Sequence, residues 1–127
     1  MNLEKVIFGF FIIFACTLNF GFFIGDIERA ELHHPMELFA AVVVNLIATV
    51  LKFGDRTQLG ATHLATSLVA SFQLVGASIV WVWRLYVVGA PMNAELTAVV
   101  VSLSGGALLA NLFSVVLLIG ETLRQGR

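Results

Sequence analysis

The stretch PMELFAAVVVNLIATVLKFGDR, from Pro35 to Arg56, decides the fold because it is an apolar run of membrane-spanning length. Three polar residues, Glu37, Asn45 and Lys52, interrupt it. At about 100° per residue, these positions fall on one side of a helix. Polar groups in the core of a bilayer are costly unless they have partners. The pattern therefore predicts a transmembrane helix whose polar stripe faces other helices or water.

The composition extends this interpretation to the whole chain. Of the 127 residues, 59% are hydrophobic and 12% are charged, whereas soluble domains average about 45–50% apolar and about 25% charged residues. Four apolar stretches approach the roughly 20 residues needed to cross a bilayer; they cover residues 6–24, 36–53, 59–83 and 96–120. We therefore expect an all-α polytopic membrane protein, with residues 1–127 forming a single domain of four transmembrane helices in an up-down bundle.

The first apolar stretch follows Lys5, as the apolar part of a signal peptide would. It is too long for one, and its end has no small-x-small cleavage site, so we expect it to be a helix of the mature chain. The single cysteine, Cys16, lies inside this stretch. One cysteine within a span can build neither a disulfide framework nor a metal cluster, and we interpret it as a packing residue.

The basic residues are divided unevenly between the two ends of the expected bundle. Those on the side of the N-terminus are Lys5, Lys52, Arg56, Arg124 and Arg127, and those on the other side are Arg29 and Arg84. Because cytoplasmic loops carry an excess of Lys and Arg, this predicts both termini in the cytoplasm, in an inner (plasma) membrane. Acidic residues outnumber basic ones on the outer side, and an acidic mouth attracts cations. Acidic residues that are merely tolerated outside are the alternative.

The outer loop GDIERAELHHP suggests a candidate cation site. Its members would be Asp26, His33 and His34, together with Glu37 at the start of the next helix. Imidazole and carboxylate groups bind divalent ions and protons. The spacing is not diagnostic, so the identity of any metal stays open, and an ordinary hydrated loop is the alternative.

Three of the apolar stretches carry an amide near the middle of the membrane. These amides, with other polar residues of the spans, form a candidate ion path or polar core: Glu37, Asn45, Gln73, Asn111, Asn19, Thr66 and Ser104. Carboxylate and amide oxygens are suitable ligands for hard cations. The alternative is that the amides only tie helices together, since interhelical hydrogen bonds of this kind are common.

The turn after the second stretch supplies a candidate cytoplasmic contact, formed by Lys52, Asp55 and Arg56 with His63. Gly54 is a natural helix terminator there. The basic side chains would reach a partner protein or substrate, or simply anchor the turn at the lipid headgroups. His63 is either an interfacial hydrogen-bonding residue or a proton relay.

A single bundle of this size has little interior, so a path for an ion would form more easily between subunits. Transport therefore predicts a homo-oligomer. The first functional hypothesis is a homo-oligomeric cation channel or carrier with an acidic outer mouth and an amide-lined path. The alternative is a non-transporting membrane subunit that docks to a larger membrane-protein partner through the cytoplasmic contact.

Other classes of function have little support in the sequence. No nucleophile–base pair can be named, so we do not expect an enzyme, and nothing indicates a cofactor. The formal net charge of −1 gives no sign of nucleic-acid binding.

The segments NLEKVIFGFF, LNFGFFIGD and ELFAAVVVNLIATVLKFGDRTQ carry a resemblance. Through them the chain resembles small uncharacterised bacterial four-helix inner-membrane proteins of a domain-of-unknown-function type. The resemblance covers most of the chain and implies no known activity. Small multidrug transporters have a similar size but rely on a Glu within the first helix, which this chain lacks. Small fluoride channels have a similar length, but none of their motifs is present.

Overall fold

The computed structural model describes residues 3–24 and 35–125, and every regular element in those ranges is helical. The elements are α1 (Leu3–Phe23), α2 (Pro35–Lys52), α3 (Gln58–Val82), the π-helical turn η2 (Trp83–Val88) that continues α3, and α4 (Ala94–Gln125). Each of the four long helices is long and apolar enough to cross a membrane. The all-α fold and the four membrane-length helices are therefore confirmed.

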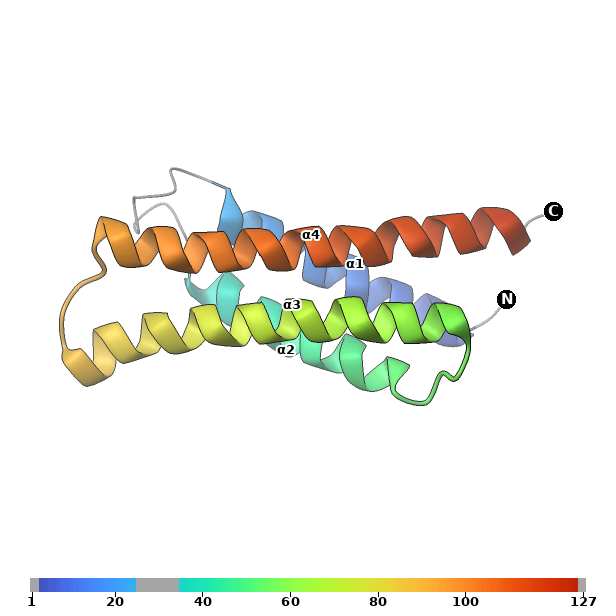
Figure 1. The fold of residues 1–127 in the computed structure, drawn as a ribbon, viewed down its shortest axis with the longest axis horizontal. Coiled ribbons are helices and arrows are strands. Elements are labelled where there is room, and N and C mark those ends of the chain that lie inside the picture. Colours follow the sequence, from blue (N-terminus) through green and yellow to red (C-terminus); the bar gives the residue numbers. More distant parts are fainter. Residues whose placement is uncertain (1–2, 25–34, 126–127) are drawn as a thin grey trace.

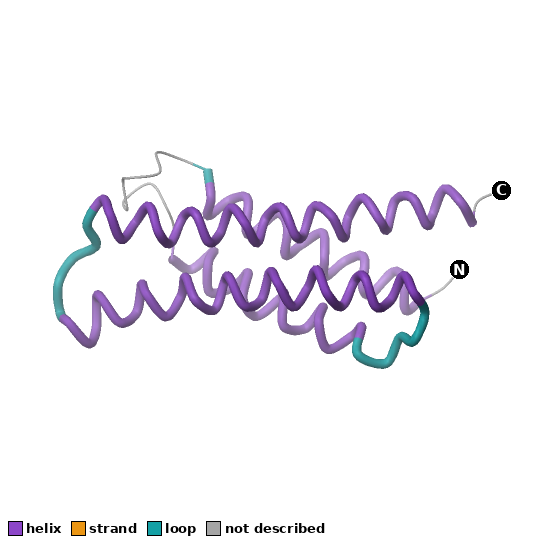
Figure 2. The backbone as a smooth tube through the Cα atoms, in the orientation of Figure 1, coloured by secondary structure: helices purple, strands orange, loops and turns teal. Residues whose placement is uncertain are grey.

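Successive helices lie side by side, and α1 also contacts α4, which closes the bundle. The start of α1 and the end of α4 lie at one end of the bundle, next to the turn between α2 and α3 (Figure 1). We call this the terminal end. The connection between α3 and α4 lies at the opposite end, which we call the distal end (Figure 2).

The α2–α3 turn is held by hydrogen bonds from its own residues. Asp55 Oδ1 accepts from the backbone N–H of Thr57 at 3.0 Å and from its hydroxyl at 2.7 Å. The Thr57 oxygen in turn accepts from the Gly60 N–H at 2.9 Å and caps α3. A Cβ at Gly60 would overlap the Asp55 carboxylate, so this close approach requires glycine. The turn therefore fixes where α3 begins.

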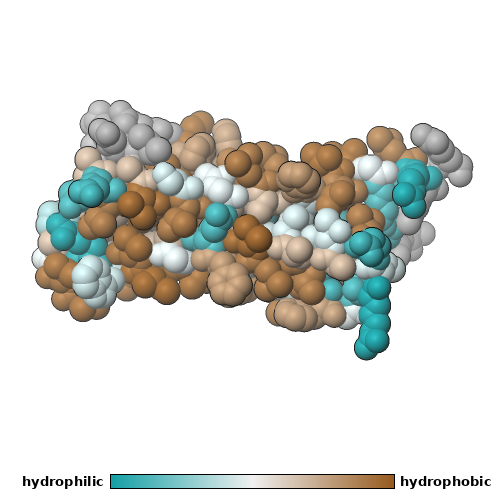
Figure 3. Space-filling view, viewed as in Figure 1, coloured by the Kyte–Doolittle hydropathy of each residue, from teal (hydrophilic) through white to brown (hydrophobic). Residues whose placement is uncertain are grey.

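The outer surface of the bundle is apolar, as contact with lipid requires. Val43, Leu46 and Val50 of α2 are exposed, whereas Asn45 is fully buried. Val43, Leu46 and Val50 thus lie on the outer side of α2, and Asn45 lies on its inner side. Hydrophobic residues dominate the middle of the molecule, and hydrophilic ones gather toward its two ends (Figure 3).

Two helices extend further than their apolar stretches. Helix α3 continues through η2 to Val88, where Gly89 adopts a left-handed conformation. Helix α4 starts after Asn93, whose side chain accepts from the Leu96 N–H at 2.7 Å, and it has 32 residues. At 1.5 Å per residue it is roughly 48 Å long, against about 30 Å of hydrocarbon. Backbone hydrogen bonds continue past the bilayer, whereas apolarity marks only the part inside it.

Candidate functional site

The interior of the bundle is unusually polar for its size. All four helices contribute buried polar side chains, namely Asn19, Asn45, Thr49, His63, Ser67, Ser71, Thr97, Ser104, Asn111 and Ser114. They lie among a core of mainly small and aliphatic residues. Because they are buried within one chain, these groups lie inside a single bundle and not on a surface between copies. We call this set the polar interior.

Part of the polar interior ties helices together. Thr49 of α2 and Ser71 of α3 are hydrogen-bonded through their hydroxyls at 3.2 Å. His63 Nδ1 lies 3.2 Å from Ser114 Oγ of α4, and Thr66 also contacts that oxygen. Interhelical hydrogen bonds of this kind contribute about 0.6–2 kcal/mol each. They account for the burial of these particular hydroxyls.

Asn19 binds the backbone of α4. With its amide oriented by the hydrogen-bond network, the nitrogen donates to the Ser104 carbonyl at 2.9 Å and the oxygen accepts from the Leu108 N–H at 2.9 Å. The glycine pair Gly105–Gly106 lies between these two residues. A Cβ at Gly106 would be 2.6 Å from the Gln73 amide, so the pair serves close packing within a continuous helix.

Several buried polar atoms, from the polar interior and from the half-buried residues Gln73 and Ser78, have no hydrogen-bond partner in the described protein. The atoms are Asn45 Oδ1, His63 Nε2, Ser67 Oγ, Gln73 Oε1, Ser78 Oγ, Thr97 Oγ1, and Asn111 Nδ2 and Oδ1. Leaving such a buried group without a partner costs about 1–3 kcal/mol. Most of these atoms are oxygens. The interior therefore offers more hydrogen-bonding capacity, chiefly acceptor capacity, than the protein itself uses.

Glu37 lies in the first turn of α2, at the distal end of the bundle. It is half-buried, and its carboxylate lies directly against Gly21 of α1, which leaves room because it has no side chain. Asn45 is eight residues further on and falls on the same side of α2. No recorded contact joins the two. Asp26, His33 and His34 of the expected outer cation site lie outside the described residues.

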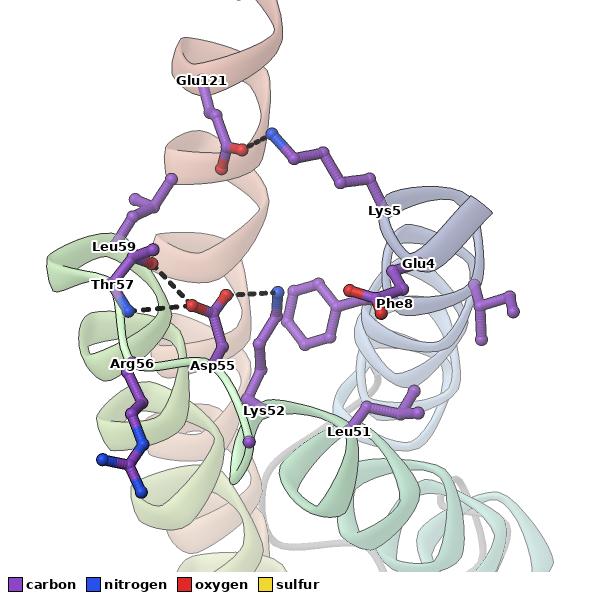
Figure 4. Close-up of a pocket in the computed structure, with 12 residues that line it drawn as sticks. Glu4, Lys5, Phe8, Leu51, Lys52, Asp55, Arg56, Thr57, Leu59 and Glu121 are labelled. Atoms are coloured by element: carbon purple, nitrogen blue, oxygen red, sulfur yellow. Dashed lines mark hydrogen bonds and ion pairs between the residues drawn. The ribbon is translucent and has the colours of Figure 1, made fainter. Parts of the chain in front are cut away.

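At the terminal end a charged cavity of about 650 Å³ opens between α1, α2, the α2–α3 turn and α4 (Figure 4). We call it the terminal vestibule. Its charged lining residues are Glu4, Lys5, Lys52, Asp55, Arg56 and Glu121. Lys5 forms an ion pair with Glu121, and Lys52 Nζ lies 3.4 Å from Asp55 Oδ2. The expected cytoplasmic contact residues Lys52, Asp55 and Arg56 are thus brought together here.

Hydrogen bonding sets the charge state of Asp55. The hydroxyl of Thr57, followed by its backbone N–H, holds the pKa of this carboxyl below its usual value, and Lys52 acts in the same direction. These donors stabilise the carboxylate form. Asp55 is therefore a fixed anion that neutralises Lys52 at the mouth of the vestibule.

His63 does not belong to this surface. It is 1% exposed, and Phe8 separates it from the vestibule. The Phe8 ring packs edge-on against the imidazole, with 4.9 Å between ring centroids, and Lys52 Nζ lies 4.2 Å from the centroid of the same Phe8 ring. Burial behind this ring means that His63 is not available to a partner protein at the surface, contrary to its expected place in the cytoplasmic contact.

Sequence reasoning missed Phe8 because α1 carries phenylalanines around most of its circumference. A usable signal exists nevertheless. The buried face of α1 is Phe8, Ile12, Ala15, Asn19 and Phe22, which follows helical spacing from the one strongly polar buried residue. Starting from Asn19 in steps of three and four identifies Phe8 as an inward-facing ring.

Four helices that are long and apolar enough to cross a membrane, packed around a polar interior, indicate a helical membrane protein. The chain belongs to the family of unknown function DUF6394, which matches residues 32–122, well over half of its length. This confirms the resemblance at the level of a family of unknown function. Comparisons with curated proteins and with solved structures found no match. Within the part of the chain that the structure describes, no group of three or more His, Cys, Asp or Glu residues is arranged to hold a metal ion.

Proposed function

We propose that the protein moves cations across the membrane, as a channel or carrier, through the polar interior of its own bundle. The observation that carries this proposal is the set of buried polar atoms without a protein partner. If the polar residues only held helices together, they would be expected to use their hydrogen bonds on one another, as Thr49 and Ser71 do. A passing ion or its hydration water would satisfy the remainder.

The chemistry of the unpartnered atoms supports a cation in preference to an anion. Hydroxyl and amide oxygens predominate among them, and such oxygens are ligands for hard cations. The first turns of α2 and α4 at the distal end carry Glu37 and Glu95. Carboxylates at a mouth raise the local concentration of cations.

The distribution of basic residues supports a cytoplasmic terminal end in an inner (plasma) membrane. Lys5, Lys52, Arg56 and Arg124 lie on elements that meet at this end, whereas Arg84 lies near the opposite end of α3. Lys and Arg are enriched in cytoplasmic segments of membrane proteins. Under this proposal, cations enter from the acidic distal end and reach the cytoplasm through the terminal vestibule.

A homo-oligomer is not required for this path. The amides Asn19, Asn45 and Asn111 are fully buried inside one chain and would not line an interface between chains. The placement of these amides favours a path within each copy, whether or not copies associate.

The test is cation flux into liposomes that contain the purified protein. We expect flux above that of protein-free liposomes, and we expect Glu37→Gln and Asn45→Leu to reduce it. The matched control for Asn45→Leu is Val43→Ala, because Val43 is 56% exposed on the lipid-facing side of the same helix. Circular dichroism would establish that each variant folds.

Liposomes that stay tight to every cation tested would contradict transport. Co-purification of one stoichiometric membrane-protein partner, together with tight liposomes, would instead support the docking-subunit alternative. In that case substitutions at Arg56, which is exposed at the vestibule, should weaken the partner's binding.

A further inference from the structure

The terminal vestibule and the polar interior meet at the Phe8 ring. One side of this side chain lines the vestibule, and the ring is only 2% exposed. His63 packs against it from the bundle interior. Lys52 Nζ lies next to the ring on the vestibule side (Figure 4). The Phe8 side chain therefore lies between His63 and the terminal vestibule.

The hydrogen bonds around His63 fix which ring nitrogen carries a proton. The Thr66 hydroxyl donates to the His63 carbonyl at 2.9 Å, so its single hydrogen is used. The close contact between Thr66 and Ser114 then requires the Ser114 hydroxyl to donate to Thr66. Ser114 Oγ can only accept from His63 Nδ1, 3.2 Å away, which must therefore carry the hydrogen.

This assignment leaves a basic lone pair on His63 Nε2. That atom is buried and has no hydrogen-bond partner among the described residues. Ser67, one turn further along α3, also has a buried hydroxyl without a partner. A neutral imidazole accepts a proton through the lone pair of its unprotonated nitrogen.

We propose that His63 Nε2 is a proton-binding site behind a Phe8 gate, so that the cation exchanged at the terminal end is the proton. This rests on the proposed function and names its cargo. When Phe8 turns aside, a proton carried by vestibule water forms a bond to Nε2 as its bond to the water oxygen breaks, and the imidazole becomes an imidazolium. Release reverses the same two bonds.

Charged groups surround this site on every side that faces the vestibule. They are Glu4 and Lys5 of α1, Lys52 of α2, Asp55 and Arg56 of the turn, and Glu121 of α4. The two ion pairs, Lys5 with Glu121 and Lys52 with Asp55, leave little net charge from these four groups.

The experiment measures proton and potassium flux separately in liposomes that contain the full-length protein. A pH-sensitive dye inside the vesicles reports protons, which a potassium diffusion potential drives. We expect His63→Gln to lose proton flux, because glutamine keeps a hydrogen-bond donor for Ser114 but binds no proton. Phe8→Ala should raise proton flux by removing the gate, and Val43→Ala should leave it unchanged.

A measurement on the unaltered protein tests the proposal without depending on whether the variants fold. The ¹⁵N spectrum of the three histidines, with His63 assigned by its disappearance in His63→Gln, should show the Nδ1–H form of neutral His63. An Nε2–H form would overturn the proposal.

Failure of proton binding at His63 and failure of cation transport would give different results. Potassium flux that is present and unaffected by His63→Gln, without proton flux, would overturn proton binding at His63 and leave cation transport standing. Absence of flux for either ion would overturn both.

Discussion

Ser67 and Ser71 lie one turn apart on α3, and both are buried, but only Ser71 has a hydrogen-bond partner. Removing a buried hydroxyl that has no partner relieves a cost of about 1–3 kcal/mol, whereas removing one that joins two helices loses about 0.6–2 kcal/mol. We therefore expect Ser67→Ala to raise the unfolding temperature and Ser71→Ala to lower it.

Thermal unfolding in detergent, followed by circular dichroism, compares the two variants under identical conditions. The pair is matched in residue type, helix and burial. Equal destabilisation by Ser67→Ala would mean that its hydroxyl is satisfied within the protein, and one support for a functional polar interior would be lost.

Individual residues were predicted from the sequence with unequal success. Asn45 was identified as inward-facing because it forms a stripe with other polar residues in an otherwise apolar run, and the structure buries it completely. His63 was grouped with the cytoplasmic contact because it lies one turn inside the helix end, whereas the Phe8 ring that packs against it comes from another helix. Burial that depends on a distant partner leaves no local signal.

At the scale of elements, one residue of the α2–α3 turn both caps α3 and stabilises the charge of Asp55. Thr57 caps α3 and donates twice to Asp55. We expect Thr57→Val to destabilise the protein by about 1 kcal/mol, the usual value of such a cap, and to raise the pKa of Asp55 toward its ordinary value. Thr62→Val is the control, since the exposed Thr62 hydroxyl bonds only to the Gln58 carbonyl of its own helix.

The lowered pKa of Asp55 determines how the stability of the folded protein changes with pH. Asp55 has a lowered pKa in the folded protein, so its contribution is fully present above its unfolded pKa and is lost as the pH falls through the folded value. Unfolding temperatures measured across the acidic range should fall less steeply for Thr57→Val than for the unaltered protein. Identical slopes would show that Thr57 does not hold the Asp55 charge.

The presence of each helix could be predicted from the sequence far more reliably than the residues at which the helix begins and ends. Each membrane-length apolar run became a helix because, in hydrocarbon, the backbone must satisfy its own hydrogen bonds. The extension of α4 to Gln125 was not foreseen, because its last turns are polar and continue as helix beyond the apolar stretch. Apolar length indicates where the membrane is, and caps such as Thr57 and Asn93 indicate where a helix begins.

For the whole molecule, the expectation that a path forms between subunits rested on volume alone. A four-helix bundle has little interior, but this bundle fills that interior with polar groups from all four helices. The sequence showed amides on three spans but not their common direction, since the rotation of each helix depends on its neighbours. We therefore propose that one chain contains a complete path for cations.

The most direct test is single-vesicle cation flux as the protein-to-lipid ratio falls below one copy per vesicle. We predict that the fraction of conducting vesicles falls in direct proportion to protein content, and that Asn111→Leu abolishes conduction at every ratio. The control is Leu109→Ala, a substitution at an exposed residue of the same helix, which should conduct normally. A fraction that falls with a higher power of protein content, or conduction that survives Asn111→Leu, would contradict a path within one chain.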